Sequence, residues 1–110
     1  MPPPPAQNTI SCTLAAGAAG SGGLNAAFSW QGAVAGVHEV RCTIWHYEAQ
    51  PGGGFAFVGR GWYNNPNALS VGNGTLTITG VVGDTYVATA GLYRNGQLVA
   101  SSQTGYVTAP

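Results

Sequence analysis

Apolar residues alternate with polar ones along most of the chain, and this period of two constrains the fold more than any other feature. The apolar members of the clearest runs are Ile10, Cys12 and Leu14; Leu24, Ala26, Phe28 and Trp30; Val40, Cys42 and Ile44; Leu76 and Ile78; and Tyr86, Ala88, Ala90 and Leu92. Glycine, asparagine and proline separate the runs, which is typical of half-buried antiparallel strands joined by turns. One side of each strand therefore faces a core, and the other faces water.

The spacing of these runs predicts the architecture. We expect strands at 8–15, 24–32, 38–48, 55–63, 74–82, 85–94 and 97–108, with an optional short strand at 68–71. Asn95-Gly96 is a strong hairpin signal between the last two long strands, because both central residues of a type I′ turn need a positive φ. About seven short strands without a helix predict an all-β fold, a two-sheet antiparallel sandwich that occupies residues 8–110 as one domain.

Residues 1–7 form a proline-rich segment before this domain. Two interpretations stay open: a stump of a stiff polyproline linker from a longer secreted chain, or the short extended arm of a small protein. The segment lacks the basic and apolar regions of a signal peptide, and it is no membrane anchor. The rest of the chain has no apolar run of about 20 residues, so we expect no membrane insertion.

Charged residues make up only 5% of the chain, and three arginines balance three acidic residues. Average globular proteins contain about 25% charged residues. A neutral, charge-poor surface disfavours nucleic acid and anionic membranes as partners, because both attract positive charge. The absence of lysine, together with many alanines and glycines, favours a bacterial source with a GC-rich genome.

The segment from Asp84 to Ala88, with the sequence Asp-Thr-Tyr-Val-Ala, resembles the tyrosine corner of immunoglobulin-like and fibronectin type III-like domains. The resemblance implies an immunoglobulin-like sandwich in which Tyr86 is buried, Asp84 caps the turn, and Trp30 and Trp45 are core or flanking tryptophans. The cysteines depart from the antibody pattern, since they fall in the first and third predicted strands. The resemblance therefore concerns the fold and carries no antibody-type function.

Cys12 and Cys42 both take inward positions, in strands that we expect in opposite sheets. This shared orientation predicts a disulfide, which would stabilise the domain by roughly 3–4 kcal/mol. The alternative is a pair of buried, reduced thiols that pack as small apolar groups. A disulfide favours an extracellular setting, which includes a secreted, cell-surface or virion-exposed protein.

Residues suited to catalysis or metal binding are scarce and scattered. His38 and His46 lie about 26 Å apart along one predicted strand, too far to share a metal. His46 and Glu48 are neighbours on one face, but no third ligand is apparent. Glu39 and Glu48 are too distant for a glycosidase pair, and no nucleophile-elbow motif is present. We expect a protein that is not an enzyme and has no metal or cofactor.

The remaining signal is aromatic. Outward positions of the strands at 38–48, 55–63 and 85–94 hold the candidate binding residues Arg41, Trp45, Tyr47, Trp62 and Tyr93. Whether Trp62 or Tyr63 lies on that face depends on whether Gly59 or Gly61 hosts a bulge. In an immunoglobulin-like sheet these strands are neighbours, so the side chains gather on one face. Exposed aromatic clusters mark interaction sites, although cross-strand ring pairs can also simply stabilise a sheet.

Two functions fit this pattern. In the first, the domain is a non-enzymatic extracellular binding module whose exposed aromatic face recognises a neutral polysaccharide (carbohydrate binding) or a protein surface. In the second, it is a structural protein, a virion decoration or surface-filament subunit that self-associates through the same face and its strand edges. The identity of the ligand and the oligomeric state do not follow from the sequence.

Overall fold

The structure is a computed structural model that describes residues 5–110. In order along the chain, its strands are β1 (Thr9–Ala16), β2 (Gly23–Gln31), β3 (His38–Ala49), β4 (Phe55–Ala68), β5 (Val71–Thr79), β6 (Thr85–Arg94), β7 (Gln97–Gln103) and β8 (Val107–Thr108). No helix that could cross a membrane occurs in this part of the chain. The predicted segment 1–7 lies partly outside the described residues, and its last three residues are exposed and form no strand.

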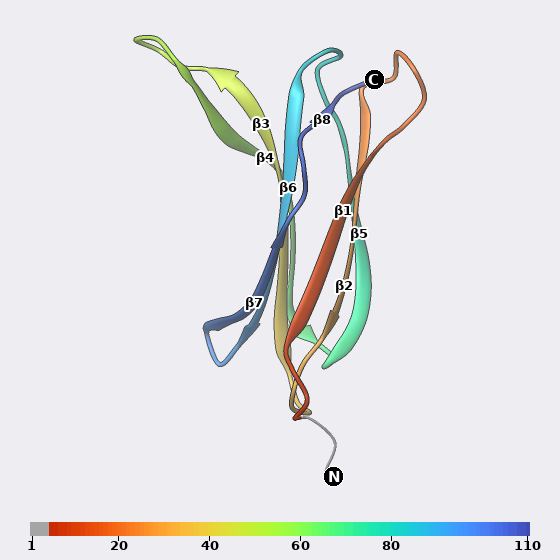
Figure 1. The fold of residues 1–110 in the computed structure, drawn as a ribbon, viewed down its shortest axis with the longest axis vertical. Coiled ribbons are helices and arrows are strands. Elements are labelled where there is room, and N and C mark those ends of the chain that lie inside the picture. Colours follow the sequence, from red (N-terminus) through yellow and green to blue (C-terminus); the bar gives the residue numbers. More distant parts are fainter. Residues whose placement is uncertain (1–4) are drawn as a thin grey trace.

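The strands form two antiparallel sheets that pack face to face (Figure 1). One sheet has the order β1-β2-β5, and the other has the order β4-β3-β6-β7, with β8 paired to β6 beyond the end of β7. The prediction of an all-β, two-sheet sandwich is therefore confirmed. The count is eight strands because the last predicted strand, 97–108, divides: Thr104 leaves the ladder and its backbone N–H donates to the Ala88 carbonyl.

The end of β4 differs from the expectation. The segment Asn64 to Asn67, which lies beyond the end of the predicted strand 55–63, continues the strand to Ala68, and no separate strand occupies 68–71. β4 pairs only with β3, so it is an edge strand of its sheet. An edge strand tolerates proline because the missing N–H of Pro66 faces no partner strand, and the ladder is irregular there, with register shifting between His38 and Val40.

The core lies between the sheets and follows the predicted alternation. Its largest members are Leu24, Phe28, Trp30, Ile44, Tyr86 and Leu92. Ile44 is fully buried while its neighbour Trp45 is only partly covered, so the predicted orientation of β3 is confirmed at that position. Trp30 belongs to the core, and its indole N–H donates to the Leu69 carbonyl oxygen at 2.9 Å.

Tyr86 anchors the turn between β5 and β6. Its side chain is buried, and its hydroxyl accepts a hydrogen bond of 2.7 Å from the backbone N–H of Val81. A Cβ atom on Gly80 would lie 2.7 Å from the Tyr86 ring, so only glycine fits there. The prediction of a buried tyrosine that hydrogen-bonds nearby backbone is confirmed.

Cys12 and Cys42 face each other from β1 and β3, in opposite sheets as predicted, but both are free thiols. The predicted disulfide is thus absent from the structure. Alternation along a strand determines which way a side chain points, whereas oxidation of a thiol pair depends on the redox environment. A hydrogen bond with the Cys12 thiol, together with burial, raises the pKa of Cys42.

Candidate functional site

The tip of the hairpin of β3 and β4 leans away from the β1-β2-β5 sheet (Figure 1). A bulge shapes this hairpin: Ile44 pairs with Gly61 and Trp45 with Gly59, so Arg60 is an extra residue on β4. Beyond the bulge Trp62 stands opposite Thr43, while Tyr63 stands opposite the inward-facing Cys42. The bulge therefore leaves Trp62 on the outer side of the sheet, as the candidate site requires.

Four rings on the outer side of this sheet form a continuous chain, which we call the aromatic face. The Phe55 ring stacks on Tyr47 with centroids 5.1 Å apart, Tyr47 contacts Phe57 at 4.9 Å, and Phe57 stacks on Tyr106 at 5.7 Å. All four side chains are exposed, from 36% for Phe57 to 70% for Tyr106. The aromatic face joins β3, β4 and the β7–β8 connection into one apolar surface.

The structure places all five predicted binding residues on the outer side of the sheet, but only Tyr47 belongs to the chain of rings. Trp45 lies partly covered beside it, and its indole N–H donates to the Thr89 hydroxyl at 2.9 Å. Trp62 is 68% exposed. Arg41 and Tyr93 form a separate pair near the other end of β3, with the guanidinium 4.4 Å from the ring centroid.

Sequence reasoning missed Phe55, Phe57 and Tyr106. The first two were detectable, because they alternate on the strand that returns from the Pro51 turn and stand beside Tyr47 in a hairpin. Tyr106 was not, because the break between β7 and β8 moves it off the strand period. The rings also support the sheet: Val87, opposite Trp45 on the outer side of β6, is buried.

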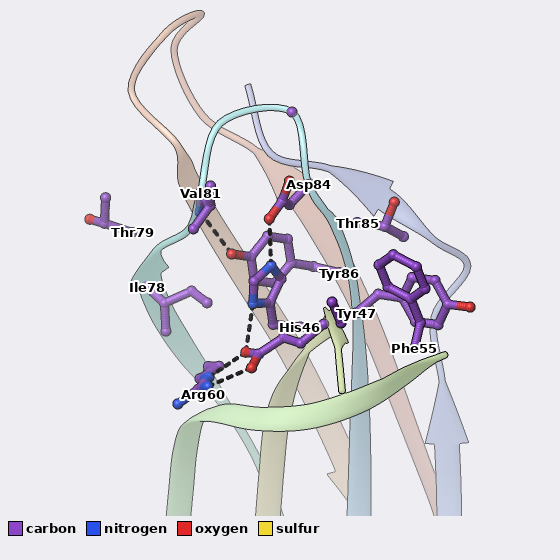
Figure 2. A pocket seen from close by; sticks show the side chains of 13 residues that line it. His46, Tyr47, Phe55, Arg60, Ile78, Thr79, Val81, Asp84, Thr85 and Tyr86 are labelled. Carbon is purple, nitrogen blue, oxygen red and sulfur yellow. Dashed lines mark hydrogen bonds and ion pairs between the residues drawn. The ribbon is translucent and has the colours of Figure 1, made fainter. Parts of the chain in front are cut away.

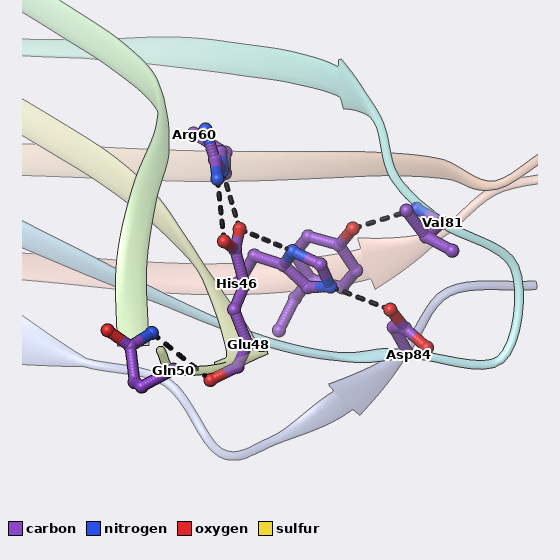
Figure 3. A network of polar contacts seen from close by, with 7 residues as sticks. His46, Glu48, Gln50, Arg60, Val81 and Asp84 are labelled. Carbon is purple, nitrogen blue, oxygen red and sulfur yellow. Dashed lines mark hydrogen bonds and ion pairs between the residues drawn. The ribbon is translucent and has the colours of Figure 1, made fainter. Parts of the chain in front are cut away.

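A chain of four charged or ionisable side chains, the polar network, lies on the inner side of the same hairpin (Figure 3). The guanidinium of Arg60 donates to both Glu48 carboxylate oxygens at 2.5 and 2.6 Å. Glu48 Oε2 lies 2.6 Å from His46 Nδ1, and Asp84 Oδ2 lies 2.8 Å from His46 Nε2. The imidazole also stacks on Tyr86, with centroids 4.6 Å apart. The network therefore ties the β3–β4 hairpin to the start of β6.

The Arg60 guanidinium, helped by His46, lowers the pKa of the Glu48 carboxyl to about 2. Each ring nitrogen of His46 meets a different carboxylate, so the imidazolium form can donate to both. The carboxylate of Asp84 binds His46, while its backbone N–H donates to the Val81 carbonyl oxygen at 3.0 Å and closes the turn. No three such side chains within residues 5–110 are arranged to hold a metal; the imidazole stands between the carboxylates.

The polar network lines one side of an open cleft of about 780 Å³ (Figure 2). Its walls come from the β3–β4 hairpin and the β5–β6 turn. Tyr47 and Phe55 line the cleft as well, so it is continuous with the aromatic face. Ring surface and polar groups thus meet in one concave region, which is the usual composition of a ligand site.

No protein family model matches this chain, and a search of curated proteins returns no significant match.

Proposed function

We propose that this domain is a non-enzymatic recognition module that binds an uncharged partner, a neutral polysaccharide or a protein surface, through the aromatic face. The observation that carries the proposal is the unbroken contact chain from Phe55 through Tyr47 and Phe57 to Tyr106 on exposed positions. Large exposed rings cost little conformational entropy on binding and are the residues that dominate interfaces. The low charge of the chain as a whole suits a neutral partner.

The proposal includes an immunoglobulin-like fold and an extracellular setting. The fold is supported by the strand order β1-β2-β5 against β4-β3-β6-β7 and by the bond between Tyr86 and the backbone of Val81. The extracellular setting loses the support of a disulfide, because the cysteines are free thiols. The extracellular setting rests on the low charge and the exposed rings. Intact-mass measurement of the protein from its natural host tests this setting, because it shows whether the two cysteines are oxidised there.

Binding assays with single substitutions test the recognition role. Phe57→Ala removes the ring that joins Tyr47 to Tyr106, so it should weaken partner binding by about 30-fold, the equivalent of about 2 kcal/mol. Leu69→Ala is the matched control, because Leu69 is 78% exposed but lies in the β4–β5 turn. Affinity electrophoresis against neutral polysaccharides and capture of protein partners supply the readout. Equal binding by the wild type and the Phe57 variant would contradict the proposal.

The second candidate function is a structural subunit that assembles with copies of itself. The observation in its favour is that the edge strands β1, β5 and β7 contain no charged residue, although charge is the usual protection of an exposed edge against pairing. Light scattering after size exclusion would reveal oligomers, and Thr13→Lys on β1 should disperse them. Oligomers that disperse with this variant and persist in Phe57→Ala favour assembly through the strand edges over recognition.

A further inference from the structure

The cleft beside the aromatic face narrows the choice of partner. Phe55 lies at the end of the ring chain, stacks on Tyr47 with one face, and has no other ring partner among residues 5–110. It is 61% exposed and lines the cleft. Its ring therefore offers an apolar platform at the cleft wall, within the same concavity as the polar network (Figure 2). Any partner that covers the aromatic face reaches the cleft at this ring.

The polar network leaves hydrogen-bonding capacity unused at two of the residues that line the cleft. Asp84 binds His46 through Oδ2, and its Oδ1 has no hydrogen bond within the described residues. Arg60 uses Nε and Nη2 for Glu48 and leaves Nη1 without a partner in the same range. The side chains of Asp84 and Arg60 are 45% and 53% exposed. The cleft thus presents a charged acceptor and a charged donor to a ligand.

The charges in the cleft compensate one another. Glu48 pairs with Arg60, and Asp84 meets an imidazole nitrogen of His46, so the cleft contains groups of both signs. An ionic ligand would gain little from such a site, whereas hydroxyl groups can accept from a guanidinium and donate to a carboxylate in strong charge-assisted bonds. A sugar ring combines such hydroxyls with an apolar C–H face that stacks on an aromatic ring. The cleft volume lies within the range of small-ligand sites, about 300–1,000 Å³.

We propose that the cleft is a subsite for consecutive neutral sugar units of a polysaccharide, with Phe55 against the apolar face of one sugar and with Asp84 Oδ1 and Arg60 Nη1, at opposite ends of the polar network, hydrogen-bonded to hydroxyl groups of different sugars. This inference rests on the proposed recognition function and names its partner as a glycan. The rest of the polysaccharide then lies along the aromatic face, from Tyr47 towards Tyr106. Asp84 and Arg60 determine which hydroxyl pattern is accepted.

Isothermal titration with a panel of neutral oligosaccharides, the gluco-, manno-, xylo- and chito-hexasaccharides, tests the subsite. At least one should bind, and Asp84→Asn should weaken it about tenfold or more, because a charged hydrogen bond becomes a neutral one. The asparagine oxygen still accepts from His46. Phe55→Ala should cause a comparable loss, and it removes an exposed ring, so folding is not at stake. Arg94→Gln, which removes a charge from the distant β6–β7 hairpin, should bind as the wild type does.

The outcomes separate the two proposals. If Phe57→Ala abolishes binding of a protein partner and no oligosaccharide binds, the recognition function stands and the sugar subsite is wrong. If an oligosaccharide binds and only Phe57→Ala weakens it, the glycan lies on the aromatic face and the cleft is not its subsite. If Asp84→Asn fails to fold by circular dichroism, the comparison of Phe55→Ala with Phe57→Ala decides: a loss of binding in Phe55→Ala alone places the glycan in the cleft, and equal losses place it on the aromatic face.

Discussion

The two outer faces of the sandwich both meet water, yet they are built from different side chains. Most exposed positions of the three-stranded sheet hold hydroxyl or amide residues, among them Thr9, Ser11, Thr13, Asn25, Ser29, Asn73, Thr75 and Thr77; Val71, at the start of β5, is an apolar exception. Some of them bond across the strands, as Ser11 does with Ser29 at 2.8 Å and Thr77 with Asn25 at 3.0 Å. The outer side of the other sheet carries the aromatic face, with Trp45, Trp62 and the Arg41–Tyr93 pair beside it.

The difference shows that the fold does not require exposed rings. Threonine and serine are sufficient for the solvent-facing side of a sheet, and they fill most of that side in the three-stranded sheet of this molecule. Rings in place of hydroxyls on the other side add exposed apolar area, which soluble proteins keep small unless it has a use. The contrast between the two faces is therefore the best evidence in the chain for a binding role. The inference of a binding role fails if the aromatic face proves to be a second hydrophobic core.

The largest expected effect compares the two sides of β3. Ile44→Ala should lower the free energy of unfolding by about 2–5 kcal/mol, because Ile44 is fully buried between the sheets and the site cannot collapse completely. On the outer side, Trp62→Ala, opposite Thr43 of β3, should cost about half of that or less, since its side chain is 68% exposed and loses little buried area. Chemical denaturation measures both. Equal losses would mean that the rings act as core.

A smaller effect compares the outer faces directly. Tyr47→Ala removes contacts with Phe55 and Phe57 and should destabilise the domain by about 0.5–1.5 kcal/mol. Thr75→Ala, at an exposed position of the other sheet, should stay within about 0.5 kcal/mol of the wild type. Thermal unfolding under one buffer condition gives both values. A Tyr47 variant as unstable as the Ile44 variant would remove the case for a binding surface.

The smallest expected effect concerns the support of the aromatic face by the polar network. The pKa of Glu48 is lowered from 4.5 to about 2, chiefly by its hydrogen bond with Arg60. Its contribution to stability is therefore complete above pH 4.5 and is lost as the pH falls towards 2, because the unfolded chain takes up the proton first.

Urea denaturation at pH 7, 4 and 2.5 measures this dependence in the wild type and in Glu48→Gln. The two proteins should differ most at pH 7 and should converge in acid. Glu39→Gln, on the outer side of β3, controls for the loss of a single carboxylate. A difference between wild type and Glu48→Gln that is independent of pH would show that Glu48 does not act through its charge.

Much of the fold could be predicted because a strand alternates with a period of two, and this rule needs only neighbouring residues. The inward positions of Ile44 and Cys42 and the outward positions of Trp45 and Tyr47 all follow from it. Errors occurred where tertiary pairing overrides local preference. Pairing with β3 keeps Asn64 to Asn67 in β4 against their turn propensity, and the division of the last strand moved Tyr106 onto the aromatic face.

The candidate site depended more on tertiary structure than the fold did. The amino-acid order alone determines which segments alternate as strands, which residues point outwards and how little charge the chain carries. The meeting of His46 with Asp84, 38 positions later in the chain, required the β5–β6 turn to close against the β3–β4 hairpin. No local pattern encodes a contact between residues so far apart, because it arises from the pairing of β3 with β6, which places His46 opposite Tyr86, two residues from Asp84. For that reason the aromatic surface could be expected from the sequence, whereas the cleft beside it could not.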